Sequence, residues 1–137
     1  MSDAEEHYIS DNADDYEQGL TPDKLKSLYA APNPAVDNVF LPGMNDIDWS
    51  QLGHAYGDAS DVPALLRALL SPNHDHRDFA LELLFQTVWH QGTVYSSSAY
   101  TVPLLSKLLT YPEIQNRAGI LYLLASLAEG HSGSGLI

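Results

Sequence analysis

The chain has 137 residues, no cysteine and a formal net charge of −12, with 18 acidic residues against six lysines and arginines. This length is enough for one hydrophobic core, and the lack of cysteine excludes disulfides, thiolate metal sites and a cysteine nucleophile. The acidic balance disfavours nucleic acid and anionic lipid as partners. The apolar runs are shorter than the roughly 18 to 20 residues of a membrane span, and the acidic start is unlike a signal peptide. We therefore expect a cytoplasmic protein without a membrane partner.

The first part of the chain carries most of the charge. Residues 1–23 hold eight acids and no lysine or arginine, which gives −8, and the rest holds ten acids and six bases, which gives −4. The apolar anchors there are few, chiefly Tyr8, Ile9 and Tyr16, and they do not offset the entropy of ordering the segment unless it docks. We predict an acidic arm over residues 1–20, either mobile or docked on the rest.

Residues 21–57 are predicted to form an N-terminal helical cap with a proline-rich connector. Thr21 followed by Pro22 is typical of a helix start, with the threonine as N-cap and the proline in the first turn. Leu25 and Leu28 supply a short apolar stripe for this helix, which is expected to end near Ala31.

The connector after this helix is predicted to be a loop. Residues 32–43 contain three prolines and a glycine among apolar side chains, a pattern typical of an extended segment that packs on a neighbour. Asp48 is then predicted to cap a short helix over residues 49–56, which Gly57 ends.

A repeat follows, because residues 62–84 recur about forty positions later as residues 102–124. In each copy a Val-Pro pair is predicted to open a helix, with Asp61 and Thr101 in the matching cap positions. A later proline ends that helix, and a second helix begins. The matched pairs are Pro72 and Pro112, Arg77 and Arg117, Leu81 and Leu121, Leu83 and Leu123, and Leu84 and Leu124.

Two apolar-striped helices joined by a short turn, repeated at about forty residues, resemble the HEAT repeats of the armadillo class. The resemblance covers about residues 60–128 and is carried by the proline of the first helix, the turn, and the arginine that starts the second helix. The segment Trp89 to Tyr95 also resembles the inter-repeat loop of a group of small bacterial HEAT-like proteins. The resemblance implies an all-α fold, a short α–α superhelix. It further implies that Arg77 and Arg117 form hydrogen bonds within or between repeats.

This resemblance sets the expected domain organisation. Two HEAT-like repeats are predicted over residues 58–130, and a flexible tail over residues 131–137. An array usually needs three or more repeats for stability, so residues 21–57 are expected to cap the first repeat.

The last predicted helix, residues 116–128, carries apolar residues on several faces. A terminal repeat normally has a polar outer face. The surplus would be covered by the acidic arm, by another subunit or partner, or by further repeats of a longer array. We expect a second copy or a partner, which predicts a homo-oligomer contact through this helix.

Catalytic and metal-binding motifs are absent from the sequence. His74 and His76, near Asp75 and Asp78, supply at most a pair of imidazoles and a carboxylate, whereas zinc needs three or four converging ligands. A solvated turn in which Asp75 caps the next helix is the simpler interpretation. No catalytic residue and no cofactor is expected.

Three functional hypotheses follow from the sequence. The first is a non-enzymatic protein-binding module, whose second helices, about residues 76–89 and 113–128, form a concave face. The inter-repeat loop lies at the rim of that face, with the candidate contacts His90, Gln91, Thr93 and Tyr95. The second is an acidic antidote or immunity-type inhibitor of a basic enzyme such as a nuclease toxin. Its candidate contacts are the arm and Asp46, Asp48, Asp58 and Asp61. The third, a metal-dependent enzyme, relies on His74 and His76.

Overall fold

The computed structural model describes residues 16–90 and 92–132, which fold mainly into helices. The helices are α2 (Pro22–Leu28), α3 (Pro34–Phe40), α4 (Val62–Ala68), α5 (His74–Thr87), α6 (Ser96–Leu108) and α7 (Arg117–Glu129), with two 3₁₀ turns, η1 (Met44–Asp46) and η2 (Trp49–Gln51). Most of the predicted arm, most of the predicted tail and Gln91 lie outside the described residues. In the described part, no helix is long and apolar enough to cross a membrane.

Two small β-sheets accompany the helices. In the first, β1 (Gly53–His54) pairs antiparallel with β2 (Gly57–Asp58). In the second, β3 (Trp89–His90) pairs antiparallel with β4 (Thr93–Val94), which pairs parallel with β5 (His131–Ser132). The predicted fold class is confirmed as mainly helical, but it is not purely all-α. Each strand has only two residues, which is too short for the alternating hydrophobic pattern by which strands are predicted from sequence.

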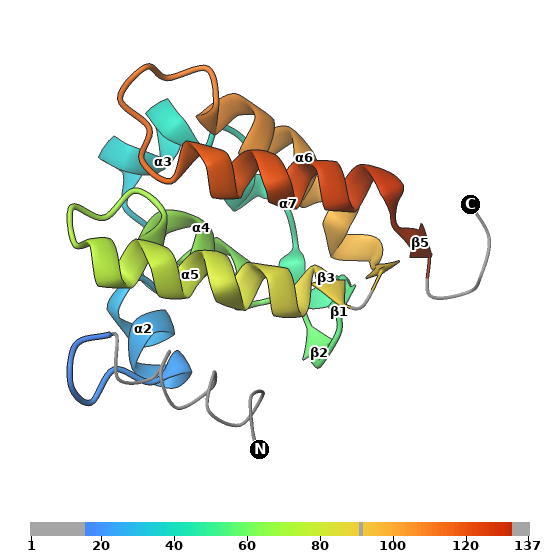
Figure 1. Ribbon diagram of the computed structural model, residues 1–137, viewed down its shortest axis with the longest axis horizontal. Coiled ribbons are helices and arrows are strands. Elements are labelled where there is room, and N and C mark those ends of the chain that lie inside the picture. The colour runs from blue at the N-terminus through green and yellow to red at the C-terminus, as the bar shows by residue number, and fades with distance from the viewer. Residues whose placement is uncertain (1–15, 91, 133–137) are drawn as a thin grey trace.

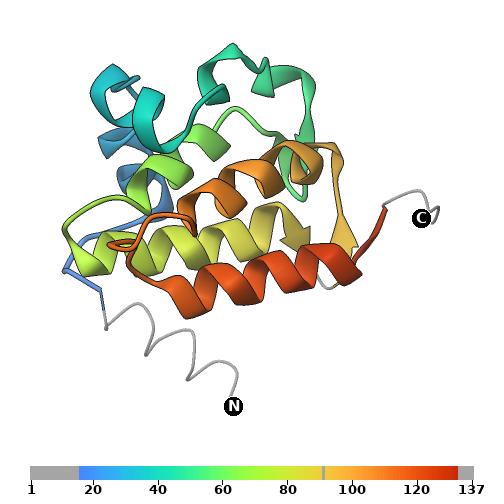
Figure 2. The same ribbon diagram turned by 90° about the horizontal axis from the view of Figure 1, so that it is seen from above.

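The helices of the two predicted repeats form two packed hairpins, α4 with α5 and α6 with α7. Figure 1 shows α5 and α7 side by side along one face of the molecule, and Figure 2 shows α4 and α6 on the inner side of this pair. The core between them is made of leucines at matching positions of the two copies, namely Leu65, Leu66, Leu69, Leu104, Leu105 and Leu108. Burying leucine stripes in this way drives the two hairpins together.

The two arginines at the start of the second helices occupy equivalent positions. Nη1 of Arg77 donates to the carbonyl oxygen of Ser71 at 2.9 Å, and Nη2 of Arg117 donates to the carbonyl oxygen of Tyr111 at 2.7 Å. Both carbonyls lie six residues before the arginine, just after the preceding helix, where orphan acceptors need partners. The predicted hydrogen bonds of these arginines within the repeat are confirmed.

The start of α2 is as predicted: the Thr21 side chain accepts a hydrogen bond from the Lys24 amide, and Pro22 stands in the first turn. The helix ends earlier than expected, at Leu28, where the Tyr29 amide bonds the Lys26 carbonyl. Arg67 of α4 then donates to the carbonyls of Tyr29 and Ala30, which have no partner within the helix.

The predicted loop over residues 32–43 is wrong, since α3 forms within it. Pro34 lies in the first turn, where backbone N–H groups have no acceptor within the helix, so a proline there costs no hydrogen bond. Asp37, also in the first turn, accepts a hydrogen bond from the Asn33 amide at 3.0 Å and is buried against Arg67. The helix is therefore stabilised by an ion pair with a distant residue. The prolines of this segment indicated a loop and gave no sign of that pair.

The predicted helix over residues 49–56 is also wrong beyond its first turn. The chain forms η2 and then the β1–β2 hairpin, and the Asp48 carboxylate accepts from Ser50 without capping. Two distant partners take the backbone amides there: Gly53 donates to the Ser96 hydroxyl at 2.7 Å, and Ala55 donates to the Thr87 carbonyl at 2.9 Å.

The second Val-Pro pair does not open a helix as predicted, because α6 starts at Ser96 and contains Pro103. Three residues separate β2 from Val62, but seven separate β4 from Val102, and the additional four supply one more helical turn. The Ser98 hydroxyl caps the new start by accepting from the Tyr95 amide. Thr101 therefore lies inside the helix.

Two other predicted caps differ. Asn73, not Asp75, caps α5, because its side chain accepts from the amides of Asp75 and His76. Asp61 precedes α4 without a side-chain cap bond, since its carboxylate binds Lys26 and His54. The last helix agrees with the prediction of residues 116–128, as α7 runs from Arg117 to Glu129.

Candidate functional site

The outer surfaces of α5 and α7 form one continuous surface, called here the α5–α7 face. The two helices approach closely at Gly119 of α7, where an added Cβ would collide with the Leu81 side chain of α5. Glycine permits this approach because it has no side chain to keep the helices apart. The face corresponds to the second-helix surface that the sequence predicted.

Three aromatic rings lie on the part of the α5–α7 face near the C-terminal end of α5 and are called here the aromatic cluster. The Phe85 ring lies 6.1 Å from Trp89 in an edge-on arrangement and 5.4 Å from Tyr122 in a tilted one, which joins the two helices. Tyr122 is 68% exposed, whereas Phe85 and Trp89 are half-buried against the core. Exposed aromatic rings held in place by packing are typical anchors of protein interfaces.

Acidic side chains outnumber basic ones on the two helices of the α5–α7 face. Asp75, Asp78 and Glu82 lie on α5, and Glu129 lies at the end of α7, against Arg77 on α5 and Arg117 on α7. In the described part of the chain, lysine and arginine form ion pairs only between Lys26 and Asp61 and between Arg67 and Asp37. Neither pair includes an acid of this face, so the two helices together carry a net negative charge.

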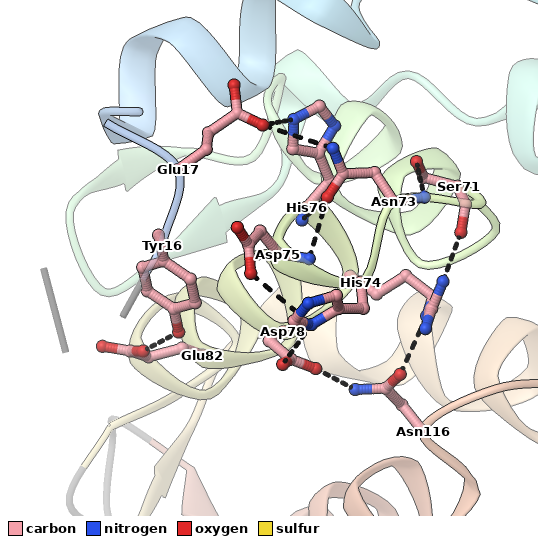
Figure 3. A network of polar contacts seen from close by, with 11 residues as sticks. Tyr16, Glu17, Ser71, Asn73, His74, Asp75, His76, Asp78, Glu82 and Asn116 are labelled. Carbon is pink, nitrogen blue, oxygen red and sulfur yellow. Dashed lines mark hydrogen bonds and ion pairs between the residues drawn. The ribbon is translucent and has the colours of Figure 1, made fainter. Parts of the chain in front are cut away.

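The start of the described chain docks on the N-terminal end of α5 (Figure 3). The Tyr16 ring stacks on Phe79 at 4.7 Å between ring centroids, and its hydroxyl donates to Glu82 at 2.6 Å. The Glu17 carboxylate lies 3.0 Å from Nε2 of His76 and accepts from the side-chain amide of Asn73. This end of the face is therefore covered by the chain itself, while the aromatic cluster is not covered by these residues.

The opposite end of the face is bounded by the second sheet, which contains the predicted rim residues. His90 and Thr93 are paired across β3 and β4, and Tyr95 directly precedes α6. All three are half-buried, and the His90 ring lies 5.7 Å from the Tyr56 ring. Because β4 also pairs with β5 after α7, this sheet ties the ends of α5 and α7 together.

The four predicted acids outside the arm have different surroundings. Asp46 and Asp48 lie in and beside the 3₁₀ turns, and both are exposed. Asp58 is also exposed, and hydrogen bonds from the Ser60 side chain and amide lower its pKa.

Asp61, the fourth predicted acid, is engaged inside the molecule. It lies 2.9 Å from Nζ of Lys26 and 2.8 Å from Nε2 of His54. Its burial acts to raise the pKa of Asp61, but the bonds to His54 and Lys26 outweigh this and lower it. The structure thus leaves three of the four acids free of lysine and arginine.

His54 lies beside an open hollow of about 550 Å³ between the first sheet, α2 and α5. Its Nδ1 accepts a hydrogen bond from the Tyr56 amide at 3.1 Å, so Nε2 carries the proton that Asp61 accepts. Both ring nitrogens are therefore occupied. A general base needs a nitrogen free to accept a proton from the substrate, and His54 in this arrangement offers none.

The histidines of the predicted metal hypothesis point to different partners (Figure 3). His74 lies 3.5 Å from Asp75 and 3.7 Å from Asp78, and His76 bonds to Glu17 and Tyr29. Across residues 16–90 and 92–132, no group of three or more histidine or carboxylate side chains is arranged to hold a metal ion.

Sequence reasoning missed a buried charge network that joins α2, α3 and α4. Nε of Arg67 donates to both carboxylate oxygens of Asp37 at 3.1 Å, and its Nη2 donates to Asn45 at 2.9 Å. Arg67 is 6% and Asp37 1% exposed. The one available signal was an arginine placed among the apolar residues of the first repeat helix.

The chain matches no family model, no curated protein and no solved structure.

Proposed function

We propose that this protein is a HEAT-like helical-repeat module that binds another protein through the α5–α7 face. In this proposal α4–α5 and α6–α7 are two repeats of a short α–α superhelix, and α2 and α3 cap the first repeat. The equivalent arginine bonds of the two hairpins support the repeat assignment.

The exposed Tyr122, held by the half-buried Phe85 of the aromatic cluster, is the observation that carries the binding proposal. Ordered aromatic side chains that remain exposed on a paired-helix surface supply large contact area at a small entropic cost. The acids of α5 and α7, which outnumber the two arginines there, indicate the charge of the partner, because a net negative surface favours encounter with a basic one. The proposed partner is therefore a protein segment with basic and apolar side chains.

A comparative pull-down from the source cell extract, read by mass spectrometry, tests this proposal. The wild-type chain is expected to retain a defined protein that Tyr122→Ala loses and Leu28→Ala retains. Leu28 is a suitable control because it is 60% exposed on α2, away from the face. Retention of the same proteins by both variants, or of none by the wild type, contradicts the proposal.

A second candidate function is inhibition of a basic enzyme such as a nuclease. It is favoured by the exposed carboxylates of Asp46, Asp48 and Asp58, none of which pairs with lysine or arginine and which would meet a phosphate-binding groove by charge. Replacing these three by asparagine is expected to slow association steeply at low salt, while Tyr122→Ala changes mainly the dissociation rate. An unchanged association rate in the triple variant contradicts this candidate.

A further inference from the structure

The side of α7 that is turned away from its contacts with α5 at Gly119 and Tyr122 carries an apolar stripe, called here the α7 stripe, that no described residue covers. Its members recur at helical spacing and are all exposed, namely Ala118, Leu121, Ala125 and Ala128. The opposite side of α7 is buried against α5 and α6 through Ile120, Leu123 and Leu127. Contiguous apolar patches on a folded protein are typical of interaction sites, and this one combines a single leucine with three alanines.

We propose that the α7 stripe binds the α7 stripe of a second copy of this chain, with the two helices antiparallel. The two-fold axis passes level with Leu123, at the middle of the helix. Positions whose numbers add to 246 then face each other, so that Leu121 faces the partner's Ala125 and Ala118 faces the partner's Ala128. Each large side chain meets a small one, which lets the helices approach closely without a clash.

The charges at the two ends of α7 favour this arrangement. Under the same axis Arg117 faces the partner's Glu129, and each end of the pair gains one such contact. Two guanidinium nitrogens of Arg117 already donate to the carbonyls of Leu109 and Tyr111. The group has five N–H donors, so enough remain for a carboxylate. A parallel pair would instead place like charges together at both ends, which is unfavourable.

A two-fold contact of this kind is isologous, since the same patch serves both copies. It also gives the terminal repeat the apolar cover that another repeat supplies in a longer array. The inference does not depend on the proposed partner of the aromatic cluster, because the α7 stripe lies on a different side of α7 from the contact with Phe85.

Sedimentation equilibrium of the full chain tests self-association directly. The wild type is expected to shift from 15.0 kDa towards twice that mass over about a thousandfold range of concentration. Leu121→Glu is expected to weaken dimerisation at least about tenfold, and Val39→Glu is expected to leave it unchanged. Val39 is a matched control for Leu121, since the two side chains are 54% and 52% exposed. A wild type that stays monomeric, or equal effects of both substitutions, overturns the proposal.

Salt distinguishes this contact from binding of a basic partner. Each copy carries a net charge of −12, so salt screens the repulsion between copies; this outweighs the screening of the two exposed Arg117–Glu129 contacts, which contribute little, and dimerisation is strengthened. Salt instead weakens binding of a basic protein to an acidic face. Self-association that weakens as salt rises overturns the apolar contact proposed here, while the partner proposal is judged by its own pull-down.

The absence of cysteine allows a direct test of the orientation. Mixing Ala118→Cys with Ala128→Cys is expected to give a disulfide-linked dimer under mild oxidation, because the two positions face each other. Either variant alone holds its two sulfurs about 15 Å apart along the helix axis, beyond disulfide reach. Cross-linking of either single variant at a rate equal to that of the mixture overturns the antiparallel arrangement.

Discussion

Arg77 donates from Nε to Oδ1 of Asn116 at 3.0 Å, which joins the second helix of the first hairpin to the residue that precedes the second helix of the other. Asn116 has a φ of 59°, a left-handed conformation that is uncommon outside glycine. Its side-chain amide also donates to Asp78 at 2.6 Å. These bonds hold the turn before α7 against α5, and so help to set the width of the α5–α7 face.

Replacing Arg77 by methionine is expected to lower the free energy of unfolding by about 1 to 3 kcal/mol, because the Ser71 carbonyl and the Asn116 side chain both lose a donor. Urea unfolding measures the change. Lys107→Met is the control, since Lys107 is exposed and its ammonium lies 5.6 Å from the centroid of the Tyr111 ring, and a change within about 0.5 kcal/mol is expected. Equal losses in the two variants would contradict the clamp role of Arg77.

Asp37→Asn is expected to be the most destabilising polar substitution in the described part of the chain. It leaves the buried Arg67 guanidinium without its counter-charge, and breaking a buried pair in this way costs about 3 to 5 kcal/mol. Chemical unfolding at neutral pH measures the loss. Asp46→Asn is the matched control, since Asp46 is exposed on the neighbouring 3₁₀ turn, and a comparable loss there would contradict the assignment.

The same carboxylate predicts how stability changes with pH. Burial acts to raise the pKa of Asp37, but hydrogen bonds from Asn45, the Asn33 amide and Arg67 outweigh it and lower the pKa below its ordinary value. The stabilisation is therefore complete above about pH 4, near the unfolded pKa, and is lost as pH falls through the lower folded-state pKa. Unfolding midpoints measured between neutral and acid pH are expected to fall less steeply in Asp37→Asn than in the wild type. Parallel curves would contradict the prediction.

Gly119 is expected to tolerate a methyl group but not a larger side chain. In Gly119→Ala the flexible end of Leu81 must move, while the helix gains propensity of up to about 1 kcal/mol, so the net change is expected to be small. Gly119→Leu must push α5 and α7 apart and is expected to cost about 1 to 3 kcal/mol. Thermal unfolding compares the two with Ala99→Leu on the exposed side of α6. An equally large loss of stability in Ala99→Leu would show that the effect of Gly119→Leu does not come from the contact between α5 and α7.

Tyr16 is expected to contribute measurably to the docking of the segment before α2. Tyr16→Ala removes the stack on Phe79, and an aromatic pair contributes about 0.5 to 1.5 kcal/mol beyond its buried area. Tyr16→Phe keeps the stack and loses only the bond to Glu82, so a smaller effect is expected. Hydrogen-exchange protection of the α5 amides measures the effect of both Tyr16 variants, and Gln18→Ala is the control. Equal protection in all variants would contradict the docking contact.

Short-range chemistry made part of the fold predictable. Thr21 with Pro22 marked the start of α2, the leucine spacing marked the core sides of α4 and α6, and the repeated arginines marked equivalent positions in the two hairpins. These features need only neighbours within a few residues, because caps, prolines and helical periodicity act within one or two turns.

The errors fall where distant residues decide the local structure. The helix over residues 34–40 is stabilised by the ion pair between Asp37 and Arg67. The hairpin over residues 53–58 is stabilised by backbone amides that donate to Ser96 and Thr87. No signal in the neighbouring sequence identifies such partners, and tertiary contacts of this strength override the local helix or strand propensity.

The candidate site divides in the same way. The sequence alone determined which helices form the α5–α7 face and that the chain is acidic. The tertiary structure decided which side chains meet on that face: it brought Phe85, Trp89 and Tyr122 together, enclosed Asp61 with Lys26 and His54, and placed Tyr16 on Phe79. The physical reason is that periodicity places a residue on one side of its own helix, whereas burial and pairing depend on the neighbour that the fold brings against it.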